Sequence, residues 1–323
     1  YLKLYNLENQ NCELIYGHGE IVLSLDAHCP ATAITDSSAC SLFASGSKDN
    51  TARVWLVDWA AADPARRVVC VAEAVGHTEA VGAVRLARKP GCNFMITGSQ
   101  DRTVKLWDLS GVPKTSAAAR QLAAPIRLSA RYTFKAHDKD INSLAIAPND
   151  QVFATGSQDK TAKLWSVAEG KLLGTFQGHR RGVWSVTFSP VDQVLATTSG
   201  DKTIKLWSLS DFSCLKTLED HTSSVLSASF VTAGMQLVSV GGDGLVKLWT
   251  IKNEECVLTL DKHEDKIWSL AVADDGAQLA TGGADSSIVF WKDTTEENIE
   301  KLHREQADEL LKEQALSNYL QAK

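Results

Sequence analysis

The sequence predicts an all-β propeller that ends in a C-terminal α-helix, and three observations support that prediction. Six of the eight histidines begin similar segments, and the last four of them are spaced at steps of 42 residues. Each segment closes on a tryptophan, and the last four tryptophans keep the same step. Between the histidine and the tryptophan lie short β-prone runs separated by turn residues. A repeat near 40 residues built this way is typical of one four-stranded propeller blade.

The composition is that of a soluble globular protein. The 323 residues are 44% hydrophobic and 22% charged, and no apolar run approaches the ~18 residues of a membrane span. The chain opens with Tyr1 rather than with a signal sequence, so we expect a soluble fragment without membrane association. The net charge of −6 excludes an overall positive field for nucleic acid, which leaves only local RNA contact possible.

The seven cysteines predict neither a metal centre nor a disulfide framework. They form an odd, scattered set without a CxxC pair, as expected for reduced thiols in an intracellular compartment. No Walker loop, dinucleotide fingerprint or HExxH motif is present, so we expect no cofactor and no small-molecule substrate.

Residues 1–16 resemble the outer half of a blade. The run YLKLYNL looks like a third strand with Tyr5 in the place of the closing tryptophan, and Cys12 to Tyr16 looks like a fourth strand. The two inner strands are missing. We therefore expect seven blades in the parent protein, of which this chain holds six complete blades and an outer half. In a rival closure, Cys12 to Tyr16 completes the last blade and the ring has six blades.

Six repeats follow within a propeller domain at residues 1–292. In one repeat, strands are predicted at Ile141 to Ile146, at Val152 to Thr155, up to Leu164 and Trp165, and at Leu172 to Phe176. A single blade cannot bury both faces of its sheet, so the blades must pack into a ring. The repeats span residues 17–57, 76–108, 136–166, 178–208, 220–250 and 262–292.

The spacing between the first three repeat histidines is longer and locates two insertions, at Asp58 to Val75 and at Leu109 to Arg131. Both are Ala-rich, with Pro and Arg, and we expect surface loops or short helical excursions there. They are either tolerated insertions or binding segments.

Residues 293–323 predict a helix. The segment has good helix formers, no Gly or Pro, and a capping box from Thr294 to Glu297. Its apolar stripe is interrupted at Gln306, so the helix is either a solvated exit helix or a connector to a partner or a following domain. We favour the connector.

Each repeat combines His, Ser or Thr, Asp and Trp at one spacing, in which the hydroxyl precedes the Asp by four residues and the Asp precedes the Trp by six. We expect a buried relay in which the indole N–H donates to the hydroxyl, the hydroxyl to the imidazole, and the imidazole N–H to the carboxylate. The six sets are His18, Ser45, Asp49, Trp55; His77, Thr97, Asp101, Trp107; His137, Thr155, Asp159, Trp165; His179, Thr197, Asp201, Trp207; His221, Ser239, Asp243, Trp249; and His263, Thr281, Asp285, Trp291.

The same residue types also suggest a serine-hydrolase triad. A hydrolase needs one exposed nucleophile with an oxyanion hole, whereas six copies at one spacing describe a structural unit. We therefore expect no catalytic residue and no enzymatic activity.

Function is expected on the face formed by the loops that carry the repeat histidines, which we call the histidine loops. Trp and Arg are the commonest anchors of protein interfaces, and two tryptophans that stand outside the relay follow a repeat histidine by five residues. Wedging of these tryptophans between blades is the alternative. The candidate partner-binding residues are Arg180, Arg181 and Trp184, then Glu264, Asp265 and Trp268, and the turn residues Lys48, Gln100 and Gln158.

The phrases TGSQDKTAKLW and TTSGDKTIKLW, each preceded by a repeat histidine, identify the chain as similar to WD-repeat proteins. The words HDKDIN, GHRRG, SDFSCLKTL and KDTTEE resemble, over nearly the whole chain, the transducin beta-like family within the UtpB assembly of the small-subunit processome. That resemblance implies a scaffold of tandem propellers in the nucleus and nucleolus, with the other UtpB subunits as partners, in the processing of precursor 18S ribosomal RNA.

Two other functions stay open beside the scaffold. Substrate receptors of ubiquitin ligases and nuclear adaptors are also WD propellers, but receptors of the cullin-four type usually carry Trp-Asp-x-Arg after the third strand. Here the corresponding residues are Trp107, Asp108, Leu109 and Ser110, which disfavours that receptor class.

Overall fold

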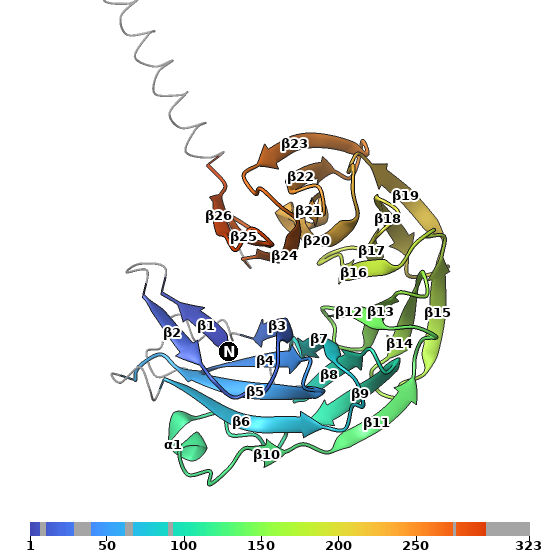
Figure 1. The fold of residues 1–323 in the computed structure, drawn as a ribbon. Helices are drawn as coiled ribbons and strands as arrows, with labels where there is room; N and C mark the ends of the chain where they lie inside the picture. The colour runs from blue at the N-terminus through green and yellow to red at the C-terminus, as the bar shows by residue number, and fades with distance from the viewer. Residues whose placement is uncertain (7–10, 29–39, 62–66, 90–92, 274–275, 295–323) are drawn as a thin grey trace, which may run out of the picture.

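The propeller fold places seven β-sheets one after another around a common axis (Figure 1). The computed structural model describes residues 1–6, 11–28, 40–61, 67–89, 93–273 and 276–294. Apart from the short elements α1 (Ser116–Ala119) and η3 (Thr232–Gly234), all regular structure in this part of the chain is β-strand. The prediction of an all-β propeller is confirmed.

Each complete blade is a four-stranded antiparallel sheet. In the blade of β12 (Ile141–Ile146), β13 (Val152–Ser157), β14 (Thr161–Ser166) and β15 (Leu172–Gln177), the strand order follows the sequence from the axis outward (Figure 1). The next two blades repeat this order with β16 (Val183–Phe188), β17 (Val194–Ser199), β18 (Thr203–Ser208), β19 (Cys214–Glu219), β20 (Val225–Val231), β21 (Gln236–Gly241), β22 (Leu245–Thr250) and β23 (Glu255–Asp261).

The two blades that precede them contain the insertions. Their strands are β3 (Val22–His28), β4 (Cys40–Ser47), β5 (Thr51–Asp58), β6 (Val68–Val75), β7 (Val81–Leu86), β8 (Phe94–Ser99), β9 (Thr103–Asp108) and β11 (Ala130–Lys135). The second part of the first predicted insertion is therefore strand, because the β-branched run at Val68–Val75 forms the fourth strand β6. The second insertion contains α1 and β10 (Ile126–Arg127), which adds a parallel fifth strand to β6.

The first sheet has only two strands, β1 (Leu2–Tyr5) and β2 (Cys12–Ile15), which pair with each other. The rival closure, in which Cys12 to Tyr16 completes the last blade, is therefore wrong. Leu2 and Ile15 pack against Trp55 of the next blade, and the Arg67 guanidinium pairs with the Glu13 carboxylate. These contacts hold the half-blade at its place in the ring.

The last blade differs from the prediction of a complete sheet. It has three strands among the described residues, β24 (Ile267–Val272), β25 (Gln278–Gly283) and β26 (Ile288–Lys292). The reason lies in the sequence, because the run after Lys292 changes to helix formers rather than a β-prone fourth strand. The helix predicted at 293–323 lies almost entirely outside the described residues.

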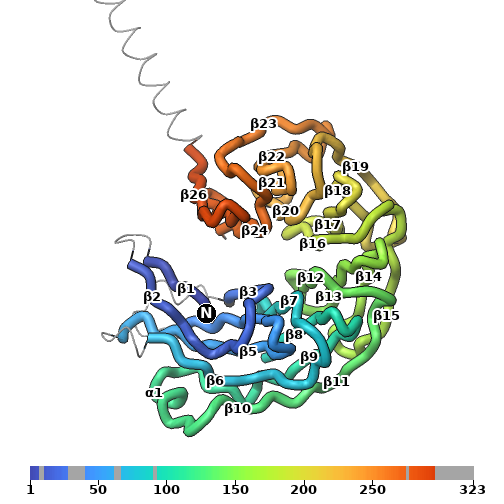
Figure 2. Tube along the Cα trace, viewed as in Figure 1, coloured from blue at the N-terminus to red at the C-terminus, as the bar shows by residue number. Residues whose placement is uncertain are grey.

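The hydrophobic core lies between adjacent blades. In one cluster, Ile204 and Leu206 of β18 pack with Val225 and Phe230 of β20 and with Leu237 of β21. Each blade thus buries its apolar side chains against the inner strands of the next, which produces the curved row of sheets in Figure 2. In the part of the chain that the structure describes, no helix is long and apolar enough to span a membrane.

Candidate functional site: the histidine-loop face and its buried relay

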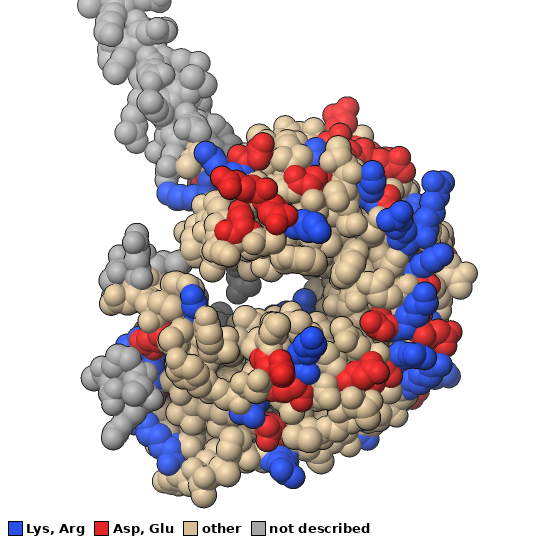
Figure 3. Space-filling view, viewed as in Figure 1, with Lys and Arg blue, Asp and Glu red and all other residues tan. Residues whose placement is uncertain are grey.

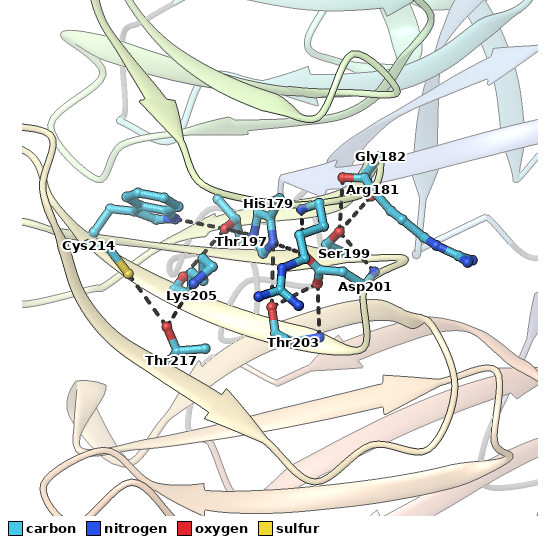
Figure 4. A network of polar contacts seen from close by, with 12 residues as sticks. His179, Arg181, Gly182, Thr197, Ser199, Asp201, Thr203, Lys205, Cys214 and Thr217 are labelled. Atoms are coloured by element: carbon cyan, nitrogen blue, oxygen red, sulfur yellow. Dashed lines mark hydrogen bonds and ion pairs between the residues drawn. The ribbon is translucent and has the colours of Figure 1, made fainter.

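A hydrogen-bonded relay crosses each of the six repeats near its histidine loop, as Figure 4 shows for His179. Trp207 Nε1 donates to Thr197 Oγ1 over 2.8 Å, and Thr197 Oγ1 lies 2.7 Å from His179 Nε2. His179 Nδ1 lies 2.9 Å from Asp201 Oδ2. The relay therefore joins the histidine loop, β17, the following turn and β18.

The structure brings all six predicted sets together in this way. His Nδ1 lies 2.8–2.9 Å from the Asp carboxylate, and His Nε2 lies 2.6–2.8 Å from the hydroxyl. The Trp Nε1 to hydroxyl distance is 2.7–3.0 Å. The imidazole side chains are only 0–2% exposed. Buried polar groups in such a relay are all satisfied.

The relay also shifts the pKa of its members. Burial lowers the pKa of His18 and His137, because desolvation disfavours the imidazolium more than the neighbouring Asp stabilises it. For Asp49, burial opposes ionisation, but hydrogen bonds from Thr51, His18 and backbone N–H groups outweigh it and lower the pKa to about 2. Neutral histidines beside ionised aspartates are thus the stable pair near neutral pH.

The geometry of the relay does not suit nucleophilic catalysis. Each Ser or Thr of the relay is at most 1% exposed, and its hydroxyl lies between the indole N–H and the imidazole. A nucleophile must reach the substrate, which this position does not allow while the blade is folded. Among the described residues, no group of three or more His, Cys, Asp or Glu could hold a metal ion.

The relay fixes the backbone of the histidine loops. The residue after each relay histidine donates its backbone N–H to the relay carboxylate, as Arg180 does to Asp201 over 2.9 Å and Glu264 to Asp285 over 3.1 Å. Because the backbone faces inward, the side chains of these loops are free to point outward. Arg181 points away from the relay in Figure 4.

Most of the candidate partner-binding residues are exposed on this face. Trp268 has 54% of its surface exposed, and its neighbours Glu264 and Asp265 are exposed, as are Arg180 and Arg181. The turn residues Lys48 and Gln100 are exposed as well.

Two of the candidates lie deeper than we expected. Trp184 is half-buried with its indole beside Gly200, and Gln158 is half-buried with its side chain against Gly182 of the next blade. Trp184 therefore offers less surface to a partner than Trp268, and Gln158 less than Lys48 and Gln100.

The relay includes further hydroxyls that the predicted sets omit. A Thr or Ser two residues after the Asp donates to its other oxygen over 2.6–2.8 Å, at Thr51, Thr103, Thr161, Thr203 and Ser287. A Ser two residues before the Asp accepts the Asp backbone N–H, as Ser199 does from Asp201 over 3.2 Å, and donates to the carbonyl of Arg181. The recurring sequence pattern Ser-x-Asp-x-Thr could have indicated both the serine before the relay aspartate and the hydroxyl residue after it.

Comparison with known proteins agrees with the geometry. The WD domain, G-beta repeat model matches residues 19–55, 68–108, 129–166, 170–208, 212–250 and 254–292, which together make up more than half of the chain. Each matched segment ends at the tryptophan of a relay or just after it.

Similar proteins confirm the resemblance, but over a shorter stretch than expected. Transducin beta-like protein 3 of Homo sapiens is 49% identical over 54% of this chain, and that of Mus musculus is 48% identical over 54%. U3 small nucleolar RNA-associated protein 13 of Saccharomyces cerevisiae is 40% identical over 50%. The matches span about a fifth of the length of these relatives.

The repeated relay, the radial sheets and the six matched segments lead to one assignment: the chain belongs to the WD domain, G-beta repeat family.

Proposed function

We propose that the chain is a non-catalytic, protein-binding propeller of a nucleolar scaffold in small ribosomal subunit biogenesis. Its partners would be the other UtpB subunits of the small-subunit processome. The scaffold would act in the maturation of precursor 18S ribosomal RNA. The identity of 48–49% with transducin beta-like protein 3 and the similarity to a U3 small nucleolar RNA-associated protein support this proposal.

One structural observation carries the binding role. The relay holds the histidine loops in a fixed conformation, and these loops present Arg180 and Arg181 to solvent, while Trp268 is exposed at the start of β24. A rigid loop loses little conformational entropy on binding, and exposed Trp and Arg are the side chains that contribute most to protein interfaces. Lys48 and Gln100 would extend this contact surface from the neighbouring turns.

The histidine-loop face carries charges of both signs. Glu264 and Asp265 precede Trp268 in the last blade, whereas Arg180 and Arg181 lie two blades earlier in the ring. Complementary charges contribute more to the orientation and selectivity of a complex than to its affinity. We infer that a partner crossing this face would bring an acidic segment to the arginines and a basic one to Glu264 and Asp265.

The domain boundaries are part of the proposal. The propeller would span residues 1–292, and residues 293–323 would form a helix that connects it to a partner or to a following domain. Because β26 ends at Lys292, such a helix would begin at the last blade of the ring.

The test is recovery of partners by the full-length protein with an affinity tag. We expect the tagged parent protein, without substitutions, to co-sediment with early pre-ribosomal particles and to recover the UtpB subunits. The combined variant Arg180→Glu, Arg181→Glu and Trp268→Ala should recover at least one subunit with about tenfold lower yield, in line with the loss of hot-spot contacts.

The matched control is Lys171→Glu with Val191→Ala. Both residues are exposed and lie in loops at the opposite end of the strands. This control should bind like the parent protein. Equal recovery by the histidine-loop variant and its control would show that this face is not the contact surface. Failure of the parent protein to sediment with the particles would contradict the proposed role in ribosome biogenesis.

A further inference from the structure

A cavity of about 980 Å³ lies at the centre of the ring, where the first strands of all six repeats line it. Figure 3 shows the molecular surface hollowed at this place, with blue Lys or Arg side chains at its wall. Cavities of ~300–1,000 Å³ are the usual sites of small molecules in proteins. Each first strand contributes a residue at the same register position: Asp26 of β3, Arg85 of β7, Ala145 of β12, Thr187 of β16, Ser229 of β20 and Ala271 of β24.

Asp26 and Arg85 are charged at a position where the other repeats have small, uncharged residues. In every repeat this residue pairs with the second-strand residue that precedes the relay Ser or Thr, as Arg85 pairs with Ile96. Four blades form with Ala, Thr or Ser there, so the packing of a blade does not require a charge at this position. The two charges are therefore a local feature of β3 and β7.

The Asp26 carboxylate is satisfied without Arg85. Its Oδ2 accepts the backbone N–H of Leu86 over 2.8 Å, and its Oδ1 accepts Arg88 Nη2 over 2.8 Å. Arg85 Nη1 lies 4.0 Å from Asp26 Oδ1, which is too far for a hydrogen bond. Among the described residues, no other carboxylate lies within that distance of Arg85. Asp26 therefore balances the charge of Arg88 and leaves that of Arg85 without a close partner.

Arg85 also has hydrogen-bond donors that the fold does not use. Its Nη1 donates to the carbonyl of Val84 over 2.9 Å, and its other N–H groups donate to no described residue. The side chain is 28% exposed, and it lines the cavity. Burial lowers the pKa of Arg85, because the charged form loses hydration, and the charge of Asp26 opposes this effect only in part. Arginine nevertheless stays protonated in proteins, so a cation with unused donors faces the cavity.

Hydroxyl groups and further positive charge complete the lining. Ser185 and Thr187 of β16 and Ser227 and Ser229 of β20 line the cavity, and their side chains make no hydrogen bond with a described residue. The charged side chains of the described lining are those of Lys3, Asp26, Arg85 and Arg88. Three of these four are basic, so the cavity carries net positive charge and free hydroxyl donors.

We propose that the central cavity binds a small phosphorylated molecule and that Arg85 is its anchor. The planar guanidinium donates parallel hydrogen bonds to two oxygens of one phosphate group, a geometry in which Arg is the preferred partner. The hydroxyls of Thr187 and Ser229 donate to further phosphate oxygens. The cavity has room for more than one phosphate group, and Lys3 and Arg88 supply the charge for a second.

The test is the affinity of the protein for tripolyphosphate, measured by isothermal titration calorimetry at constant ionic strength. We expect one binding site per chain. Arg85→Gln should weaken the affinity at least tenfold, because it removes the charge-assisted hydrogen bonds to one phosphate group. Thr187→Val with Ser229→Ala should weaken it about threefold or more without any change in charge.

The matched control is Arg102→Gln. This arginine is exposed in the turn between β8 and β9 of the same blade, and its side chain makes no hydrogen bond with a described residue. The control removes the same charge, so it should change the affinity by less than about twofold. Equal affinities of the Arg85→Gln and Arg102→Gln variants, or no measurable binding by the parent protein, would overturn the proposal.

Thermal melting separates a ligand site from a structural ion pair. Without ligand, Arg85→Gln should melt within about 1 °C of the parent or higher, because the guanidinium has no close partner in the fold. Tripolyphosphate should raise the melting temperature of the parent and leave that of Arg85→Gln nearly unchanged. A variant that melts several degrees lower and still binds like Arg102→Gln would show that Arg85 serves the fold and not a ligand.

Two further probes test the class of ligand. Hexaglutamate offers carboxylates instead of phosphates, and oligouridylate offers phosphates on a nucleic acid chain. Both should bind at least tenfold more weakly than tripolyphosphate, because neither places several phosphate oxygens against Arg85 and the hydroxyls at once. Equal or tighter binding of hexaglutamate would assign the cavity to an acidic peptide, and the same result with oligouridylate would assign it to RNA. Either result would contradict the proposal.

Discussion

Asp201 and Arg180 are joined by one hydrogen bond that links the interior of a blade to its surface. The backbone N–H of Arg180 donates to Asp201 Oδ2 over 2.9 Å, and the same oxygen lies 2.9 Å from His179 Nδ1. The Arg180 side chain is exposed, whereas the His179 ring is buried. A buried relay therefore sets the backbone conformation of a loop whose side chains face solvent.

We expect His179→Ala to lower the free energy of unfolding by about 1–3 kcal/mol, because it leaves Asp201 and Thr197 without a buried partner. Lys171→Ala, an exposed change in the same blade region, should alter stability by less than about 0.5 kcal/mol. Chemical denaturation of both variants measures the difference. A His179→Ala variant as stable as the parent would mean that the relay contributes nothing to stability.

Two tryptophans give a second, matched comparison. Trp207→Phe removes the N–H that donates to Thr197 and should cost about 1–3 kcal/mol of stability. Trp268→Phe removes no hydrogen bond made by a described residue, and at 54% exposure should cost less than about 0.5 kcal/mol. Thermal melting compares the two, and the reverse order of their effects would contradict the assignment of one tryptophan to the core and the other to the surface.

The blades and the relay were predictable because both depend on local spacing. His179, Thr197, Asp201 and Trp207 lie at fixed intervals, so one repeat indicates its histidine loop, turn and strands. The pairing of Ile126 with Ala72 was not predictable, because it joins segments far apart in the chain through a two-residue strand with no local signal. The three-stranded last blade follows from its own sequence, because the run after Lys292 consists of helix formers rather than β-prone residues.

The exposure of the two candidate tryptophans shows the limit of prediction at the site. Trp184 and Trp268 both lie five residues after a repeat histidine, and their sequence contexts are alike. Trp184 lies beside Gly200, where a Cβ would be 3.3 Å from its Nε1, whereas Ala284 occupies the equivalent place near Trp268. Trp268 also belongs to the last, three-stranded blade. The two tryptophans therefore have different surroundings, and their common spacing from a repeat histidine does not reveal the difference.

Gly156 tests the packing between blades. A Cβ at this residue would lie 2.8 Å from Val183 Cγ1 and 3.0 Å from Val186 Cγ1 of the next blade. Gly156→Ala should therefore destabilise the protein by about 1–3 kcal/mol through overpacking. At Gly111 a Cβ would meet no atom within 4 Å, so Gly111→Ala serves as the control and should be neutral. Equal stability of the two variants in urea would contradict the face-to-face contact of these blades.

The shifted pKa values predict how stability depends on pH. His18 and His137 have their pKa lowered by burial, below the ordinary value of 6.5, so the unfolded chain takes up protons first as the pH falls through that value. The aspartates of the relay add to this below their ordinary value of 3.8, because hydrogen bonds lower the pKa of Asp49 to about 2 and that of Asp159 further. Wherever the unfolded state binds more protons, stability falls with falling pH.

The expected result is a melting temperature that is steady above pH 7, declines as the pH falls below 6.5, and falls more steeply below pH 3.8. Asp159→Asn should melt lower than the parent at pH 7, and the difference between the two melting temperatures should narrow as the pH drops below 3.8, because the unfolded parent then takes up a proton that the folded Asp159 carboxylate does not. Circular dichroism at each pH measures both curves. A difference between parent and variant that stays constant down to pH 2 would show that the carboxylate is not the group that titrates.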